Sequence, residues 1–384
     1  MTNRERFFNL LEKKPLDRLP FFPDISTWYE CTRKEMGEEE IFGPGAYIPD
    51  AEGFHRRPSR LPGRMGRMTF LDFYREYDWG LPVHMAAWVK ISYDDKVTEE
   101  ITREGPFKIT TLTTPRGTLR ARHQLAADGS WAPIEHFVKE LKDLEAIKYA
   151  LAHQHFTPAF HEIEKFHRET EGFGVCDLVL WRSPFGQLVH DLMGFEQVIY
   201  ALYDHENVVL EMLEFMTEHK LKLVELAAQA PARLAIISDH ADENLIAPPF
   251  YRKYCIPYYQ KATSILHRAG KLISTHLDGN FRSFFPFIKE TGFDLLDGCT
   301  PAPMFNYTPE ELAVAAGEDL HCYCGVPATL LTQRLPTREI VNFGLRIAKA
   351  FRNRVLVNIG DILPPEGDIE QVIELGKAVQ SLRG

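Results

Sequence analysis

Residues 234–280 read LAIISDHADENLIAPPFYRKYCIPYYQKATSILHRAGKLISTHLDGN, and this stretch indicates the fold class. It contains two short apolar runs, at 234–237 and 272–274, and such runs are typical of buried parallel strands. The segment between them, which includes residues 249–268, has the pattern of one helix. Two strands joined by a helix form a βαβ unit, so the stretch predicts an α/β fold.

Each apolar run ends directly in ionisable side chains. Asp239 and His240 follow the first run, and His276 and Asp278 follow the second, with Asn280 two residues further on. Loops at the carboxyl ends of parallel strands carry the active site in α/β proteins. Histidine and aspartate can ligate metals and move protons. We therefore expect the active centre at these two strand ends.

Strand-like and helix-like segments alternate from residue 134 to the end of the sequence, which is typical of repeated βαβ units. Segments such as 196–228 predict helices, and residues 19–25 predict a Pro-flanked strand. Further apolar runs predict strands at 173–181, 234–238, 272–275, 293–296, 320–323 and 355–359. With one more strand whose position the pattern does not give, this predicts a (β/α)8 TIM barrel as a single domain over 1–384. A doubly wound open sheet is the alternative.

The N-terminal part of the sequence predicts an elaboration of the barrel. Thr2 and Glu5 fit a helix capping box. Residues 26–133 are expected to form a cap or insert within the same domain. Period-two alternation over 88–124, broken by Pro-Arg-Gly at 115–117, predicts an inserted antiparallel hairpin.

Composition narrows the class of protein. The 384-residue chain has a formal net charge of −10 and an isoelectric point near 5.9, which argues against nucleic acid or an anionic membrane as partner. The six cysteines are scattered, so we expect reduced thiols and a cytoplasmic location. No uninterrupted apolar run reaches the roughly 20 residues that a membrane span needs. The sequence lacks the glycine-rich fingerprints of dinucleotide and P-loop sites.

Several short motifs together resemble those of the uroporphyrinogen decarboxylase superfamily, which includes the cobalamin-dependent methyltransferases. The sequences NRERF at 3–7 and DRLP at 17–20 are similar to the start of that family. APPFY at 247–251, HLDGN at 276–280 and GDILPP at 360–365 are similar to its S-P-x-x-F helix start, its H-x-C-G-N strand end and its late G-C-x-I-P-P loop. The resemblance implies a (β/α)8 barrel with the site at the carboxyl ends of the strands.

The resemblance separates two chemistries. The decarboxylases carry an R-Q-A-G-R loop that grips the carboxylates of a porphyrinogen. The corresponding residues here, PDISTWYE at 23–30, contain two acids and no arginine, so they would repel a substrate with many carboxylates. The similarity therefore implies the methyltransferase branch. A metal-free decarboxylase that acts on a small carboxylated substrate is the alternative.

The methyltransferase branch binds zinc, and the resemblance implies the ligands. One subgroup uses His-x-Cys and a distant Cys, and this sequence has Asp278 and Asp361 where those cysteines would stand. Another subgroup spaces its ligands as E-x14-E-x20-H, and His240, Cys255 and His276 occupy that spacing here. Imidazole and thiolate suit Zn²⁺, and three protein ligands leave a fourth position open. We predict His240, Cys255 and His276 as zinc ligands, with Asp278 and Asp361 as alternatives.

The resemblance also implies the reaction. A bound zinc ion would act as a Lewis acid on a methyl–oxygen bond, and the methyl acceptor would be cobalamin on a partner corrinoid protein. The expected catalytic residues are Asp239, His240 and His276. The expected substrate contacts are Trp28, Trp181, Asp278 and Asn280. The aromatic rings would suit a small donor such as an aromatic methyl ether, and the family implies a homodimer.

Overall fold

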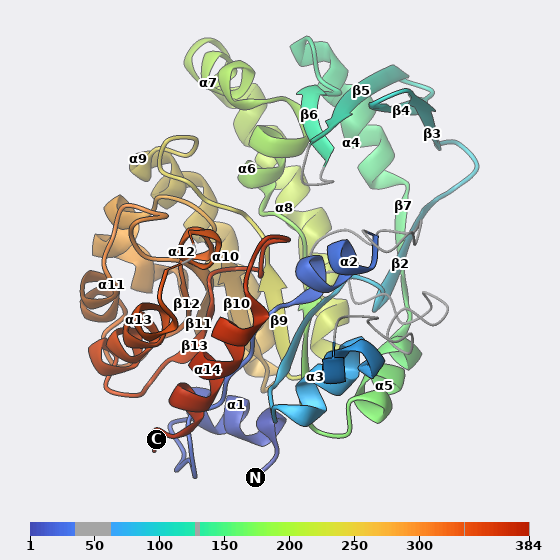
Figure 1. The fold of residues 1–384 in the computed structure, drawn as a ribbon. Helices are drawn as coiled ribbons and strands as arrows, with labels where there is room; N and C mark the ends of the chain where they lie inside the picture. The colour runs from blue at the N-terminus through green and yellow to red at the C-terminus, as the bar shows by residue number, and fades with distance from the viewer. Residues whose placement is uncertain (35–62, 127–130, 334, 384) are drawn as a thin grey trace.

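The computed structural model describes residues 1–34, 63–126, 131–333 and 335–383. Residues 35–62 and 127–130, which belong to the predicted N-terminal insert, lie outside the described part. A parallel sheet lies at the centre of the described molecule and is flanked by helices (Figure 1).

The central sheet has seven parallel strands, and their order across the sheet follows their order along the chain. They are β1 (Leu81–Met85), β8 (Gly174–Val179), β9 (Leu234–Ile237), β10 (Leu272–His276), β11 (Leu295–Cys299), β12 (His321–Val326) and β13 (Leu356–Ile359). The six strands predicted from 173–181 onwards are confirmed. A doubly wound sheet reverses its strand order at a switch point, so the sequential order is not that of the alternative fold.

β1 is the strand whose position the sequence pattern did not give. Its five residues include Pro82 and His84, which interrupt the apolar run that would mark a buried strand. It pairs in parallel with β8, from Leu81 opposite Gly174 to Met85 opposite Leu178.

The strand predicted at 19–25 is reduced to one parallel bridge. This bridge joins Phe21 to Val357 of β13. On its other side, the amide of Gly80, directly before β1, donates to the carbonyl of Phe21 (2.8 Å). Pro20 and Pro23 lack amide protons, which limits a longer ladder here.

The described helices cover the sheet and extend beyond it. They are α1 (Asn3–Leu11), α2 (Ser26–Lys34), α3 (Phe70–Glu76), α4 (Leu144–Ala152), α5 (Phe160–Glu169), α6 (Pro184–Gln187), α7 (Phe195–Asp204), α8 (Glu206–Gln229), α9 (Pro248–Phe250), α10 (Ile256–Arg268), α11 (Pro309–Ala316), α12 (Ala328–Thr332), α13 (Thr337–Ala350) and α14 (Ile369–Gln380). Single turns of 3₁₀ or π geometry are η2 (Gly63–Arg67), η3 (Leu141–Asp143), η4 (Leu188–Leu192), η5 (Tyr251–Cys255) and the longer η6 (Arg282–Thr291). None of the helices that the structure describes has the length and apolarity to cross a membrane.

Two predicted helices are interrupted. The helix expected over 249–268 consists of α9, the π-helical turn η5 and α10. Pro257 has no amide proton to donate to the carbonyl four residues before it, and a π turn accommodates that loss. The helix expected over 196–228 is divided into α7 and α8 at His205, which has a non-helical backbone (φ −144°).

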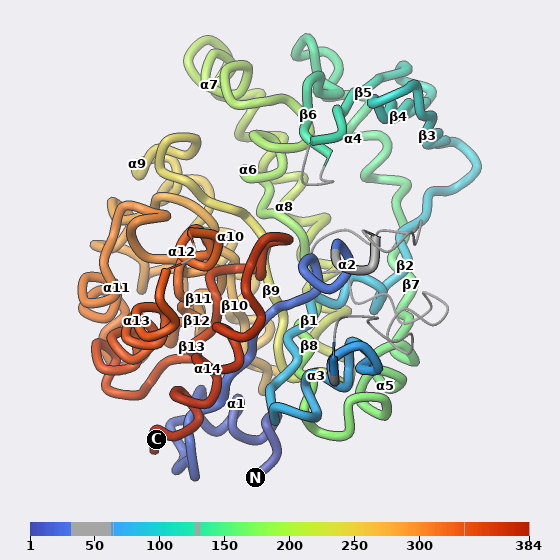
Figure 2. Tube along the Cα trace, viewed as in Figure 1, coloured from blue at the N-terminus to red at the C-terminus, as the bar shows by residue number. Residues whose placement is uncertain are grey.

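Two antiparallel assemblies include strands of the predicted insert, and one of them also uses a strand beyond residue 133. β2 (Val89–Tyr93) pairs with β7 (Gln154–Pro158). A four-stranded meander follows with β3 (Thr98–Glu104), β4 (Phe107–Thr114), β5 (Gly117–Leu125) and β6 (Trp131–Glu135). The predicted turn at 115–117 joins β4 to β5. The meander lies at the end of the molecule opposite the two termini (Figures 1 and 2).

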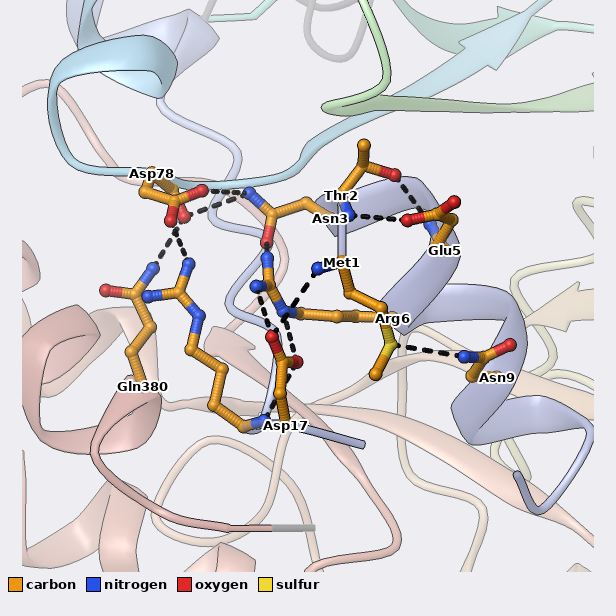
Figure 3. Close-up of polar contacts among 10 residues, drawn as sticks. Met1, Thr2, Asn3, Glu5, Arg6, Asn9, Asp17, Asp78 and Gln380 are labelled. Carbon is orange, nitrogen blue, oxygen red and sulfur yellow. Dashed lines mark hydrogen bonds and ion pairs between the residues drawn. The ribbon is translucent and has the colours of Figure 1, made fainter. Parts of the chain in front are cut away.

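Polar contacts hold the N-terminal helix in place. α1 begins with the predicted capping box, because the Thr2 hydroxyl accepts from the Glu5 amide and the Glu5 carboxylate accepts from the Thr2 amide. Arg6 is 6% exposed and donates to both carboxylate oxygens of Asp17, at 2.8 and 2.7 Å. Gln380 of α14 reaches the same network, so the first and last helices are tied together (Figure 3).

Candidate active site

Two histidine–aspartate pairs lie toward the carboxyl end of the central sheet; the His276–Asp297 pair is buried, whereas His84 in the other pair is partly exposed. His84 of β1 is in register with Asp177 of β8, and its Nδ1 lies 2.9 Å from Asp177 Oδ1. His276 of β10 is in register with Asp297 of β11, and its Nδ1 lies 2.8 Å from Asp297 Oδ2. His84 Nε2 lies 3.6 Å from Asp297 Oδ2, so the two pairs form one network.

The charges of this network stabilise one another. Burial alone would lower the pKa of His84, but the carboxylates of Asp177, Asp297 and Asp361 outweigh it and raise that pKa to about 10. Burial also opposes the charge of His276, and Asp297 and Asp361 raise the pKa of His276 to about 9. Burial favours the neutral form of Asp297, yet the neighbouring imidazoles lower its pKa below the ordinary value. Each imidazole therefore carries a second proton, and with it a positive charge, at neutral pH unless a metal cation displaces that proton.

A cavity of about 210 Å³ opens beside the network. Its wall includes His84, His276 and Asp297. His240 from the loop after β9 and Asp361 from the loop after β13 also line it. The other polar lining residues are Asp24, Ser238, Tyr323 and Asn358.

Among the residues that the structure describes, two sets of three side chains can bring one ligand atom each to within 4.8 Å of the others. The first set is His240, His276 and Asp278, and the second is His84, His276 and Asp297. His276 belongs to both sets. A single metal ion at either place would therefore contact this imidazole.

The first set has the arrangement of a metal centre. His276 is held at Nδ1 by Asp297, which leaves Nε2 facing the Asp361 carboxylate at 3.6 Å. His240 Nδ1 lies 3.9 Å from Asp278 Oδ2. A ligating histidine ordinarily donates its other nitrogen to a carboxylate, as His276 does. Two imidazoles with one or two carboxylates form a donor set that suits Zn²⁺.

Cys255 and Asp239 lie outside the lining of this cavity. Cys255 is fully buried in the π-helical turn η5 and is a member of neither described set. Burial, with the charge of Asp239, raises the pKa of the Cys255 thiol well above its ordinary value. Asp239 is also fully buried, and its carboxylate accepts from the Ser183 amide (2.7 Å) and from the Tyr259 hydroxyl.

The predicted substrate contacts are dispersed. Trp28 is 6% exposed and packs edge-on against Phe73, with 5.8 Å between ring centroids. The backbone amide of Asn280 donates to the carboxylate of Asp242 at 2.9 Å. Trp181 lines a different cavity. Asp278, the fourth predicted contact, stands beside the cavity histidines in the first ligand set.

Three residues in the loops that follow strands of the central sheet have a left-handed backbone. They are Trp181 after β8 (φ 53°), His240 after β9 (φ 47°) and Asp361 after β13 (φ 51°). This conformation costs roughly 1–2 kcal/mol for a residue with a side chain. Such strain concentrates at functional sites, where surrounding contacts hold it. At His240 one such contact is the hydrogen bond from its amide to the His276 carbonyl (3.1 Å).

The sequence reasoning missed His84, Asp177 and Asp297. His84 lies in the strand that the pattern did not place. Asp177 lies inside the predicted strand 173–181, and Asp297 directly follows the predicted strand 293–296; the structure includes them in β8 and β11. A carboxylate in a fully buried strand needs a partner, so a lone Asp within an apolar run was the available signal.

A comparison with protein families shows to which family the chain belongs. The family described as "Uroporphyrinogen decarboxylase (URO-D)" matches residues 127–382. The chain belongs to the URO-D family. As this match covers all central strands from β8 onward, it includes most of the residues around the cavity.

Among individual proteins, the chain is similar to several methyltransferases. It is 22% identical over 292 residues to the methylcobamide:CoM methyltransferase MtbA of Methanosarcina acetivorans, covering 76% of this chain and 74% of that protein. It is 22% identical over 301 residues to MtbA of Methanosarcina mazei, covering 77% and 75%. A solved structure, a methyltransferase from Methanosarcina mazei, has 12% identity and a TM-score of 0.63 over 99% of both chains, which shows a shared fold.

Proposed function

We propose that this URO-D family member is a zinc-dependent methyltransferase. It would move a methyl group from a small donor, such as an aromatic methyl ether, to the cobalamin of a corrinoid protein. The observation that carries the proposal is the set His240, His276 and Asp278, with Asp297 on Nδ1 of His276. The similarity to two proteins named methylcobamide:CoM methyltransferase supports the same class of reaction.

The first ligand set would hold the zinc ion. His240, His276 and Asp278 supply three ligand atoms, and Asp361 offers a further carboxylate beside His276 Nε2. Three protein ligands leave room for a substrate atom. Bound zinc supplies Lewis acidity toward the oxygen of the leaving group.

The surrounding side chains have separate tasks. Asp297 accepts the Nδ1 proton of His276, which keeps the Nε2 lone pair directed at the ligand position. His84 is paired with Asp177 and places a protonated imidazole in the cavity wall. That positive charge stabilises an oxygen that becomes anionic as the methyl group leaves.

The cavity wall disfavours a porphyrinogen. The cavity has a volume of about 210 Å³, which is small for a tetrapyrrole. A small methyl donor does not meet this obstacle. This contrast favours methyl transfer over the decarboxylation for which the family is named.

We also infer that the parallel sheet closes into a (β/α)8 barrel over a single domain of residues 1–384. Phe21 links the two edges of the sheet, through its bridge to Val357 of β13 and the hydrogen bond that it accepts from Gly80, directly before β1. In a closed barrel the ends of β1 and β13 would face the same mouth. The presence of His84 and Asp361 in one cavity wall supports this closure.

Metal analysis followed by a methyl-transfer assay tests the proposal. Purified protein from zinc-replete cells should contain about one zinc ion per chain, as a single catalytic site requires. With a corrinoid protein in the cob(I)alamin state and a panel of methyl ethers, the cobalamin spectrum should change to that of methylcobalamin. His276→Ala should abolish both results.

The matched control is His267→Ala. His267 also pairs with an aspartate, Asp294, at 2.9 Å, but it is exposed and lies outside the cavity lining. This variant should keep zinc and activity. Methyl transfer that survives His276→Ala would contradict the proposal. Release of CO₂ from small carboxylic acids by metal-free protein would favour the decarboxylase alternative.

A further inference from the structure

A second cavity, of about 270 Å³, lies between the antiparallel insert and helix α8. Its wall combines residues of β2, β3, β4 and β7 with residues of α4, α6 and α8. Four aromatic side chains line it: Tyr93, Phe137, Phe156 and Trp181. It shares no lining residue with the cavity at the strand ends.

One cation in this apolar wall has no partner. Lys220 of α8 is 8% exposed, and within the described chain its ammonium makes no hydrogen bond and no ion pair. The nearby carboxylates are already engaged. Asp191 pairs with Arg182 at 3.2 Å, and Asp239 accepts from the Ser183 amide at 2.7 Å. Burial lowers the pKa of Lys220 to about 8, so the ammonium is still mostly protonated at neutral pH.

A buried acceptor lies in the same wall. The side-chain carbonyl oxygen of Gln187, on α6, is shielded from solvent and has no hydrogen-bond partner in the described residues. His219, the neighbour of Lys220, is already bonded to Gln154 (2.9 Å) and leaves Gln187 free. A buried polar atom without a partner costs roughly 1–3 kcal/mol, so the site would gain from a ligand that supplies a donor.

We propose that this cavity binds a small aromatic carboxylate. The carboxylate would pair with Lys220, and the ring would pack among the four aromatic side chains. A hydroxyl on the ring would donate to the carbonyl oxygen of Gln187. Charge-assisted pairs and aromatic contacts of this kind are the common anchors of small-ligand sites.

Size and charge restrict the ligand further. A volume of about 270 Å³ is slightly below the usual range of small-molecule pockets and fits a single substituted ring rather than a fused cofactor. Glu99, on the exposed strand β3, is the other acidic lining residue besides Asp191. The Glu99 carboxylate disfavours an anion at the β3 side of the cavity, so the carboxylate of the ligand is expected at the α8 side. The proposal is independent of methyl transfer, since it involves none of the proposed zinc ligands.

Calorimetric titration of the full-length protein with 4-hydroxybenzoate and with 4-hydroxybenzamide tests the proposal. The two probes have the same shape, but only the first carries a charge. The acid should bind at least about tenfold more tightly than the amide, which corresponds to one buried charge-assisted hydrogen bond. This comparison needs no variant, so it stands even where a substitution disturbs folding.

Two variants locate the charge. Lys220→Met should weaken binding of the acid by about 10- to 100-fold and leave binding of the amide unchanged. Lys222→Met, two residues further along α8 at an exposed position, is the matched control and should bind the acid like wild type. Equal binding of acid and amide, or equal effects of the two variants, would overturn the proposal.

A carboxylate could also bind at the histidine-rich cavity, so the titration is repeated with His276→Ala. The affinity for 4-hydroxybenzoate should not change. Binding that is lost in His276→Ala and kept in Lys220→Met would place the acid at the strand ends, and absence of any binding at millimolar concentration would also reject the site.

Discussion

His219→Gln tests how a buried histidine limits the stability of the protein in acid. His219 lies on α8, is 5% exposed, and places its Nε2 2.9 Å from Gln154 Oε1. Burial, with the positive charges of Lys220 and Lys222, lowers the pKa of His219 to about 4. Histidine in an unfolded chain has a pKa of about 6.5. As the pH falls, the unfolded state therefore binds this proton first.

The magnitude follows from the two pKa values. The free energy of unfolding decreases as the pH falls from about 6.5 toward the folded pKa of about 4, because protonation favours the unfolded chain. Between pH 7 and pH 5 this single histidine should remove about 2 kcal/mol. Glutamine does not titrate and keeps an N–H for Gln154. Wild type should therefore lose about 2 kcal/mol more than His219→Gln over this interval.

Urea denaturation at pH 7 and pH 5 measures the difference, and equal m-values would show that the unfolded states are comparable. His205→Gln is the matched control, because His205 is an exposed histidine at the start of the same helix. This control should lose as much stability in acid as wild type. Identical acid sensitivity of wild type and His219→Gln would refute the assignment of a neutral, buried His219.

Three further predictions concern the metal, the first helix and the surface. The Cys255→Ala variant should keep its zinc. The Asp278→Asn variant should lower zinc affinity by at least the roughly tenfold that loss of an outer partner costs. A chelator competition in which Cys255→Ala lost zinc more easily than Asp278→Asn would support the ligand set with Cys255. Thr2→Ala should lower the free energy of unfolding by about 1 kcal/mol through loss of the cap, and an unchanged urea midpoint would disprove this. Arg252→Met should change stability by less than about 1 kcal/mol, since its 2.9 Å pair with Glu290 is solvent-exposed, and a larger loss would show that the pair is coupled to the fold.

Much of the fold was predictable because parallel strands are apolar on both faces. The run LAII in β9 is continuous and fully buried, so its pattern is visible in the sequence. β1 was not predictable in this way, because Pro82 and His84 interrupt its apolar residues. The break of the helix over 249–268 was also missed. It depends on the hydrogen bond that Pro257 cannot make, which hydrophobic periodicity does not report.

The candidate site was predictable only where its residues follow the strands in the sequence. His240, His276 and Asp278 stand at strand ends, and the structure places them in one set. Cys255 was chosen from its spacing, but spacing along a helix does not specify the direction of a side chain, and Cys255 is buried outside the cavity lining. Asp297 also follows a predicted strand, 293–296, but its pairing with His276 depends on the register between β10 and β11, which only the assembled sheet defines.

The cavity at the strand ends is lined by residues that range from Asp24 to Ile362. A ribosome must therefore synthesise the chain as far as Ile362 before the wall can be complete. A nascent fragment that ends earlier lacks part of the wall and cannot form the whole cavity. For the same reason, a premature stop codon anywhere before the loop after β13 would remove Asp361 and Ile362 from the wall. A loss of binding would then indicate either a truncated chain or a damaged site.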